Sequence, residues 1–313
     1  PLIQLPAQAQ ELMLEEVIVT ARKREQSLQD VSVAVTALTS ETIIDAQLYS
    51  AQDLVQMVPS LTFQEGSNPR QSSFNVRGIG TQSFSTGVEP SVSTMLDGVV
   101  MGRSGQAFMQ LLDVERVEVL RGPQGTLFGK NASAGVVHII TKDPSEEFSG
   151  ELMGGAAEGG EYRGGATVAG PITDTLGYRL SGYASDIDGW VHNFYNGEDL
   201  NSKEEWSVRG KFKWDATDTL TLRWASDYSK MDCECTATPL RSMDPWDGND
   251  DTVDDILAEI APVVPGEENT EVNLNSETYN DWESWGHALD VNWDIGDFTL
   301  TSITAVREFN IDV

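Results

Sequence analysis

Two kinds of hydrophobic pattern occur along the chain, and they meet near residue 146. Before that point, short runs with strand-like alternation are interspersed with stretches whose apolar residues recur at helical spacing. After it, segments of about ten residues alternate strictly between apolar and polar positions, as half-buried strands do. The pattern therefore predicts an α+β domain followed by a sheet of long antiparallel strands.

In the first part, the spacing predicts a strand over 31–38 and a helix over 40–48. Ser50 and Asp53 form a capping-box pattern ahead of a second helix, which Pro59 ends. Short runs typical of strands follow, separated by Gly and Ser, at 61–64, 73–77, 92–100, 116–120 and 136–141.

The second part has the features of a membrane barrel wall. Trp206 and Trp214 bracket one apolar face, as aromatic girdles do, and the segments have the length that a tilted strand needs to cross a bilayer. Short turns alternate with long loops. A soluble antiparallel sheet is the alternative, because it alternates too. Seven strands are predicted, at 148–158, 161–170, 176–188, 204–215, 219–230, 284–294 and 298–310.

Seven strands cannot close a barrel around a domain-sized plug, and single-chain bacterial barrels have even strand numbers. An open sheet in a membrane would leave backbone groups unpaired. We therefore expect the sequence to be the N-terminal part of a longer protein.

Composition narrows the possible partners. Fifty acidic residues and 20 basic residues give a net charge of −30, which argues against nucleic acid. Residues 7–9 have the small-x-small pattern of a signal-peptidase site, so 1–13 is predicted to be a signal-peptide remnant or a flexible N-terminus. Cys233 and Cys235 are the two cysteines, and they form either a local disulfide, which we favour, or bonds to other chains.

The glycine-rich segment 121–135 has the composition of a phosphate loop but not its spacing. Gly129 and Lys130 are present, but Gln124 stands where the first glycine of a P-loop belongs, and Asn131 replaces the required hydroxyl. The glycines instead predict tight turns and close backbone approach.

Four motifs together resemble the TonB-dependent outer-membrane transporters over residues 15–145. They correspond to the family's energy-coupling box, its (I/V)RG plug segment, its YxDGV plug strand with Met95 in place of tyrosine, and its most distinctive glycine-rich segment. In this sequence they lie at 15–21, 74–80, 92–100 and 116–135.

The resemblance implies a plug inside a 22-stranded barrel in the bacterial outer membrane. It divides the chain into a TonB box at 14–22, a plug domain at 23–145 and about seven barrel strands at 146–313. It also implies active import of a scarce ligand, such as a ferric siderophore or another large nutrient, driven by TonB of the TonB–ExbB–ExbD complex. Oligosaccharides or aromatic compounds are alternative ligands, an accessory lipoprotein is a further possible partner, and no enzymatic activity or cofactor is expected.

The coupling segment can be understood physically, since β-branched residues favour an extended strand that adds to the edge of a partner's sheet. A disordered leader with an apolar cluster is the alternative. The predicted TonB-binding residues are Glu15, Glu16, Val17, Ile18, Val19, Thr20 and Ala21.

Two further groups of site residues follow from the resemblance. Arg70, Phe84 and Arg103 lie on plug loops that would face the ligand, where arginine can bind a carboxylate or ferric chelate and phenylalanine can stack on a ring. Charged plug residues would pair with inward-facing barrel residues or with the acidic neighbours of these residues. The inward-facing barrel residues include Arg179, Arg209, Lys211 and Arg223. Ordinary solvation of the charged plug residues is the alternative. The plug residues of this second group are Arg77, Glu115, Arg116, Glu118 and Arg121.

The loop over 231–284 is strongly acidic, with thirteen acidic residues and no Lys or Arg between 244 and 283. Val253, Ile256, Leu257 and Ile260 predict a short amphipathic helix there. Part of the loop imitates a calcium-binding loop, but Thr252 and Ala258 occupy two essential positions. A solvated acidic loop that meets divalent cations on lipopolysaccharide is the alternative. The candidate calcium ligands are Asp247, Asn249, Asp251 and Asp255.

Two other classes of protein are alternatives to a transporter. A passive porin needs neither a coupling box nor a plug-like domain, and a soluble surface adhesin does not need strands bracketed by aromatic residues. Both are therefore less consistent with the sequence than a transporter.

Overall fold

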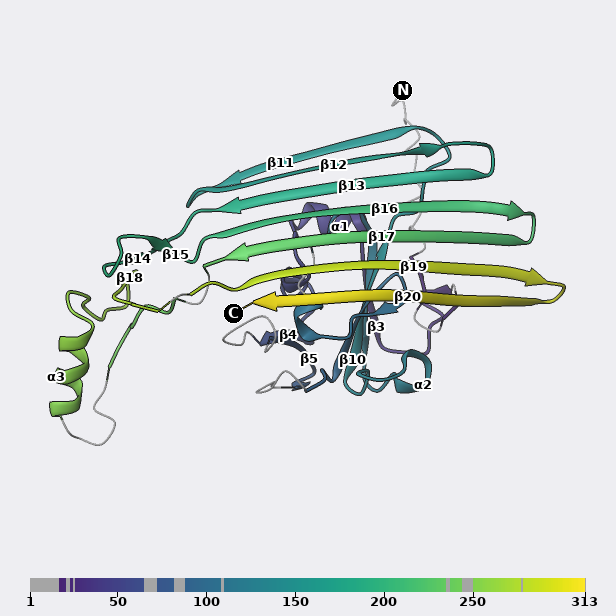
Figure 1. The fold of residues 1–313 in the computed structure, drawn as a ribbon. Helices are drawn as coiled ribbons and strands as arrows, with labels where there is room; N and C mark the ends of the chain where they lie inside the picture. Colours follow the sequence, from purple (N-terminus) through teal and green to yellow (C-terminus); the bar gives the residue numbers. More distant parts are fainter. Residues whose placement is uncertain are drawn as a thin grey trace, which may run out of the picture.

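The computed structural model contains a compact domain lying against one face of a long antiparallel sheet (Figure 1). We call these parts the plug and the wall sheet. The structure describes residues 17–20, 23–24, 26–64, 72–81, 88–107, 110–234, 237–243, 250–276 and 278–312.

The plug is built on a five-stranded sheet in the order β3-β9-β10-β7-β8. Its neighbours are antiparallel except β7 and β10, which run parallel. The strands are β3 (Val35–Thr39), β7 (Val92–Leu96), β8 (Val99–Val100), β9 (Val114–Arg121) and β10 (Gly135–Thr141). A second, three-stranded sheet contains β4 (Leu61–Gln64), β5 (Ser73–Val76) and β6 (Ile79–Gly80).

Short helices connect these strands. α1 (Ser40–Asp45) begins where the Thr39 hydroxyl accepts a hydrogen bond from the Thr42 amide. The others are the 3-10 helices η1 (Ala51–Gln56) and η3 (Ser104–Ala107) and the single turn α2 (Gly125–Phe128). No helix among the described residues is long and apolar enough to cross a membrane.

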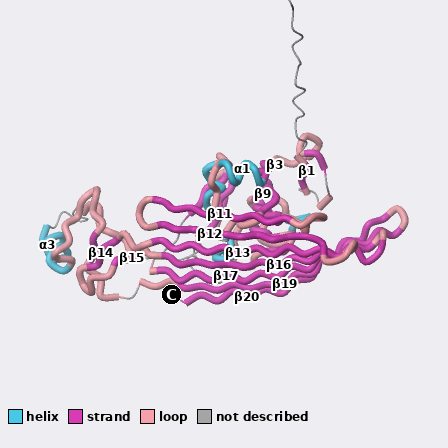
Figure 2. Tube along the Cα trace, turned by 90° about the horizontal axis from the view of Figure 1, so that it is seen from above, coloured by secondary structure: helices cyan, strands magenta, loops and turns pink. Residues whose placement is uncertain are grey.

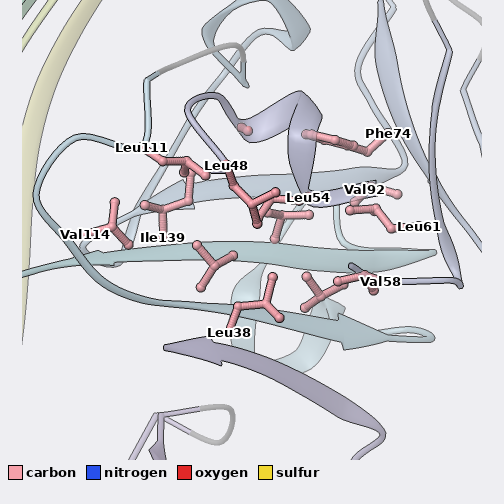
Figure 3. Packing of buried hydrophobic residues seen from close by; sticks show 14 of the residues in the cluster. Leu38, Leu48, Leu54, Val58, Leu61, Phe74, Val92, Leu111, Val114 and Ile139 are labelled. Atoms are coloured by element: carbon pink, nitrogen blue, oxygen red, sulfur yellow. The ribbon is translucent and has the colours of Figure 1, made fainter. Parts of the chain in front are cut away.

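The plug core lies between its sheets and helices. Leu54 of η1 is fully buried, and Figure 3 shows it beside Leu48 in a cluster that also contains Val114 of β9 and Ile139 of β10. Burying each such side chain contributes about 1.5–3 kcal/mol. Most of the plug's stability therefore comes from apolar packing on its central strands.

The plug differs from the sequence prediction in several places. The helix predicted over 40–48 ends at Asp45. Residues 92–100 form a hairpin rather than one strand, because Asp97 and Gly98 both have positive φ and make the two-residue turn between β7 and β8. The capping box of Ser50 and Asp53 is present, but it begins a 3-10 helix. The first predicted strand starts at Val35 instead of residue 31.

The wall sheet contains seven strands that are hydrogen-bonded in chain order, with β11 and β20 at its edges. Adjacent strands are antiparallel throughout, and each lies within a few residues of a predicted strand. Their bounds are β11 (Ser149–Ala157), β12 (Glu161–Pro171), β13 (Leu176–Ile187), β16 (Lys203–Thr217), β17 (Leu220–Cys233), β19 (Asp281–Ile295) and β20 (Phe298–Asp312).

The two faces of the wall sheet differ in chemistry. The face turned away from the plug presents large aromatic side chains, with Trp206 stacked on Tyr228 and Trp214 and Trp293 about half exposed near the other end. Aromatic residues at both ends of an apolar band are typical of a lipid-facing surface. The opposite face carries the charged residues that meet the plug.

A small folded unit, the loop module, lies beyond one end of the long strands, opposite their short turns (Figure 1, Figure 2). It combines the connection between β13 and β16 with that between β17 and β19, and Val191, Leu200, Ala237 and Val272 form its core. Its elements are β14 (Val191–Asn193), β15 (Asp199–Leu200), β18 (Glu271–Val272) and the predicted helix, α3 (Asp250–Glu259).

Cys233, at the end of β17, is disulfide-bonded. The sequence contains one other cysteine, Cys235, which lies outside the described residues. A disulfide at Cys233 is common to both alternatives drawn from the sequence, the local bridge and the bond to another chain.

Gly135 provides a test of how tightly the central plug strands pack. A Cβ at this position would lie 2.6 Å from the Leu120 carbonyl oxygen and 3.0 Å from a Val76 methyl group, whereas a Cβ at Gly125 would meet nothing within 4 Å. We expect Gly135→Ala to destabilise the plug by about 1–3 kcal/mol through overpacking. Gly125→Ala, the control, should be neutral or slightly stabilising, and denaturant unfolding of the plug would measure both; equal effects would contradict this packing.

Candidate functional site

The predicted coupling segment is docked on the plug as a short strand. β1 (Ile18–Val19) pairs with β2 (Gln26–Ser27), and the Leu28 amide donates to the Val17 carbonyl at 2.8 Å. Val19 is fully buried in a second cluster that includes Leu120 and Val136, while Ile18 remains 41% exposed. The segment is thus held by one buried side chain and a minimal strand pairing.

A buried carboxylate anchors the end of this segment. Glu118 on β9 is completely buried, and its Oε1 accepts a 2.7 Å hydrogen bond from the Thr20 amide and a longer one from the Thr20 hydroxyl. The Nε of Arg116 donates to the same oxygen at 2.9 Å. Of the other predicted TonB-binding residues, Glu15, Glu16 and Ala21 lie outside the described residues.

The plug is fixed to the wall sheet chiefly by acidic plug residues and basic wall residues. Arg179 of β13 donates two hydrogen bonds of 2.5 Å to Asp113, and Ser181 donates a third. Burial alone would raise the pKa of Asp113, but the hydrogen bonds and charge of Arg179 outweigh it and hold this pKa below its usual value. Asp113 is therefore ionised at neutral pH.

A second contact of the same kind lies on the neighbouring wall strands. Asp143, which follows β10, accepts a 2.8 Å hydrogen bond from Arg223 and a 3.3 Å bond from Lys211. These cations hold the pKa of Asp143 below its usual value, although burial opposes the shift. Lys211 also donates to the Thr141 carbonyl and lies 3.4 Å from Asp97 in the β7–β8 turn.

The sequence prediction named suitable wall residues but different plug partners. Arg179, Lys211 and Arg223 all meet plug carboxylates, and Arg209 donates to the Leu112 carbonyl. The described contacts of the predicted plug residues are instead within the plug. Arg116 pairs with Glu115 and Glu118, Arg121 donates to the Val35 carbonyl, and Arg77 has an exposed side chain at a positive-φ turn position.

The difference between the predicted plug residues and those that contact the described wall strands has a geometric reason. β9 lies between β3 and β10, so its side chains are taken up by the plug's own packing and by the coupling segment. The wall is reached from the ends of the central strands and from turns, where Asp97, Asp113 and Asp143 lie. Strand-end residues carry no periodic signal, and pattern analysis therefore did not find them.

The predicted ligand residues are only partly visible. Arg70 and Phe84 lie outside the described residues, whereas Arg103 is exposed beside a small depression that Phe74 and Met101 also line. Of the predicted calcium ligands, Asp247 and Asn249 also lie outside them. Asp251 and Asp255 belong to α3 rather than to a wrapped loop, and no cluster of three or more potential metal-binding side chains occurs in the described part of the chain.

The loop module presents an aromatic row that sequence analysis missed. Alternation along β14 buries Val191 and Asn193 and leaves Trp190, His192 and Phe194 on the other face. His192 packs edge-on against Phe194 with 5.2 Å between ring centroids, and its Nδ1 lies 2.9 Å from Asp199. The alternation of apolar and polar residues could have identified this row, but a three-residue strand is too short for the alternation to be recognised in the sequence.

Comparison with known proteins identifies the family. Residues 27–136 match the model of the TonB-dependent receptor plug domain. The chain is 34% identical over 163 residues to the pesticin receptor of Yersinia pestis, covering 51% of this chain and 24% of that protein. It is 27% identical over 214 residues to the ferric-pyoverdine 358 receptor of Pseudomonas putida, covering 66% of this chain and 24% of that protein.

Solved structures agree on the fold. The ferric yersiniabactin uptake receptor of Yersinia pestis superimposes with a TM-score of 0.73 at 22% identity, over 89% of this chain and 41% of that one. The ferripyoverdine receptor of the outer membrane of Pseudomonas aeruginosa gives a TM-score of 0.68 at 17% identity, over 89% and 34%. The expected fold, a plug followed by strands of a receptor barrel, is confirmed.

The chain belongs to the TonB-dependent receptor family. This membership confirms the expected location in the bacterial outer membrane. The chain spans about a quarter of the length of the curated relatives described above.

The Asp113–Arg179 contact predicts how firmly the plug is held. Asp113→Asn would leave the buried Arg179 without its anionic partner, so we expect the plug to be released from the wall more easily by about 3–5 kcal/mol. A cysteine introduced into the plug would become reactive toward a thiol probe when the plug leaves the wall. The urea concentration at which half of the plug is released would measure the change in stability of this contact. Glu89→Gln, which breaks the exposed Lys130–Glu89 pair, should change the midpoint little; similar shifts for both variants would contradict the anchoring role.

Proposed function

We propose that this chain forms part of a receptor that actively imports a large, scarce nutrient across the outer membrane, using TonB of the TonB–ExbB–ExbD complex as its energy source. The observation that carries the proposal is the docked segment 17–20, a short β-branched strand on a plug that is itself fixed to a wall sheet by ion pairs. A passive pore has no need of either feature.

The way the segment is attached suits reversible use. Its pairing with β2 spans only two residues. Its side-chain anchors are the buried Val19, the partly buried Val17 and the contact between Thr20 and Glu118. A strand held by so few bonds can leave the plug and add to the edge of a partner's sheet, where backbone hydrogen bonds provide the affinity. We propose TonB as that partner.

Replacing Ile18 tests this proposal. Ile18→Pro removes a backbone donor that strand addition needs, so we expect TonB-dependent uptake to be lost while ligand binding to whole cells is retained. Ile18→Val, which keeps the donor and the β-branched side chain, is the matched control and should import normally. Normal uptake by the proline variant, measured with labelled ligand at equal receptor abundance, would overturn the assignment.

A ferric siderophore is the first ligand class that we propose. The relatives described above include receptors for pyoverdine and yersiniabactin, and an exposed arginine such as Arg103 can bind an anionic chelate through its guanidinium group. Arg70 and Phe84 remain predicted ligand residues. Lipopolysaccharide is the proposed contact of the lipid-facing aromatic surface.

The loop module favours a second ligand class, a neutral oligosaccharide or a small aromatic compound. Trp190 and Phe194 offer exposed ring faces for stacking, and the carboxylates of Asp199 and Glu198 are suited to accept hydrogen bonds from hydroxyl groups. An acidic surface of this kind repels an anionic chelate. The specific observation behind this alternative is the aromatic row on β14.

Removing the aromatic row distinguishes the two classes. If the module binds a neutral sugar, Trp190→Ala and Phe194→Ala should each weaken binding of a maltooligosaccharide by about five- to tenfold, as expected for the loss of one stacking contact. Phe298→Ala, which removes a still more exposed aromatic side chain at the short-turn end, should have no effect. Isothermal titration with the purified full receptor would also test a ferric siderophore, and unchanged sugar affinity in both module variants would exclude the second class.

A further inference from the structure

Glu118 and His138 form a directly opposed pair on adjacent plug strands. They are register partners between β9 and β10, so their side chains leave the sheet on the same face. Both are buried, and each has one polar atom without a partner among the described residues, namely Glu118 Oε2 and His138 Nδ1. Two orphaned polar atoms on facing residues require an explanation, because an unmade buried hydrogen bond is costly.

The hydrogen-bonding state of His138 follows from its other nitrogen. Its Nε2 accepts a 3.0 Å hydrogen bond from the Gly98 amide and therefore carries no proton. Burial lowers the pKa of His138 to about 4, so the ring is neutral and its single hydrogen is on Nδ1. An orphaned donor on His138 thus stands opposite an orphaned acceptor on Glu118.

The two ends of this pair reach different parts of the molecule. The second oxygen of Glu118 holds the Thr20 amide of the coupling segment. The second nitrogen of His138 holds Gly98, whose neighbour Asp97 lies 3.4 Å from Lys211 on the wall. Gly98 itself lies close to Ile303 of β20.

We propose that Glu118 and His138 form a hydrogen-bonded pair, directly or through one water molecule, which links the docking of segment 17–20 to the position of the 97–98 turn at the wall. Both are positioning residues. The inference rests on the proposed function in one respect, that segment 17–20 is the coupling strand. When the turn moves, Gly98 releases the imidazole and the ring is free to rotate away from Glu118. The carboxylate then has an unpaired oxygen, becomes hydrated and releases Thr20.

The charges around the pair are consistent with a structural link rather than a mobile proton. Arg116 neutralises Glu118 from one side, and Lys23 and Asp97 also act on the imidazole. One oxygen of Glu118 accepts from Thr20 and Arg116, and the second oxygen faces His138. Thr20 and Gly98, at opposite ends of the pair, are connected through three hydrogen bonds, of which the middle one is inferred.

Amide hydrogen exchange in the full receptor, without TonB or ligand, tests the pair. Glu118→Gln preserves the shape of the side chain, but its amide NH2 group faces a donor of either Thr20 or His138. His138→Phe removes the contacts of the ring with both Glu118 and Gly98. Each should accelerate exchange at Thr20 by about tenfold or more, the size expected for losing a hydrogen bond to a charged group. The double variant should be no faster than the more affected single variant. Exchange in β4 and β5 reports any general loosening of the plug and should not change.

A variant of the turn tests the link to the wall without altering Glu118 or His138. Asp97 is 20% exposed and has a φ of 46°, which asparagine adopts readily. Asp97→Asn removes the charge that faces Lys211 and keeps an oxygen that can accept the 2.8 Å hydrogen bond from the Thr141 amide. Asp97→Asn should accelerate amide exchange at Thr20 severalfold in the otherwise unchanged receptor. In a receptor that already carries His138→Phe, it should cause no further acceleration. Glu89→Gln is the control and should leave exchange unchanged.

Additive effects of the two buried variants, or an Asp97→Asn effect that persists without His138, would overturn the proposal. Unchanged Thr20 exchange in His138→Phe would also overturn it. These measurements involve no transport, so the relay can fail while the import function stands. Normal uptake by Ile18→Pro would remove the proposed function but leave the hydrogen-bonded pair intact.

Discussion

The ionic contact between plug and wall is the constraint on which the rest of this structure depends. Asp113 and Asp143 are mostly buried among cations of three wall strands, where an unpaired charge of either sign would be strongly unfavourable. Paired, these groups fix the plug in one position. When water reaches these charged groups, it can replace their partners, so the plug and the wall can separate. A continuous apolar interface of equal area would resist the entry of water and would hold the plug permanently.

Charge placement explains an apparent conflict with composition. The chain has a net charge of −30, yet its wall sheet turns basic side chains toward the plug, namely Arg179, Arg209, Lys211 and Arg223. Strand alternation requires this segregation, because the opposite face carries the aromatic residues that meet lipid. Because its basic side chains lie on the inner face, the wall attracts the carboxylates of the plug. Much of the chain's excess of acidic residues lies in other parts of the molecule, including the loop module.

How much could be predicted from the sequence depended on periodicity. Strands such as β16 and β17 alternate over more than ten residues, so their bounds and their inward-facing cations were predictable. Asp113 and Asp143 occupy strand ends, where no repeat marks them as contacts. The loop module was hidden for another reason, since β14 and β18 are two or three residues long and pair across a large separation in sequence. Glu118 was recognised as charged and functional, but its partner is the coupling segment rather than the wall.

The coupling segment and the wall contacts belong to one continuous strand pair. β9 runs from Val114, next to Asp113 at the wall, through Glu118, which holds Thr20, and β10 runs back toward Asp143. A rigid and largely buried strand pair transmits displacement better than a loop would, because its packed side chains occupy discrete positions. Force applied at the N-terminal segment would therefore act on β9 and β10, whose ends carry the ionic contacts with the wall. Pulling would break these ionic contacts first, because water can replace the partners of a charged group but cannot replace the apolar contacts of the core.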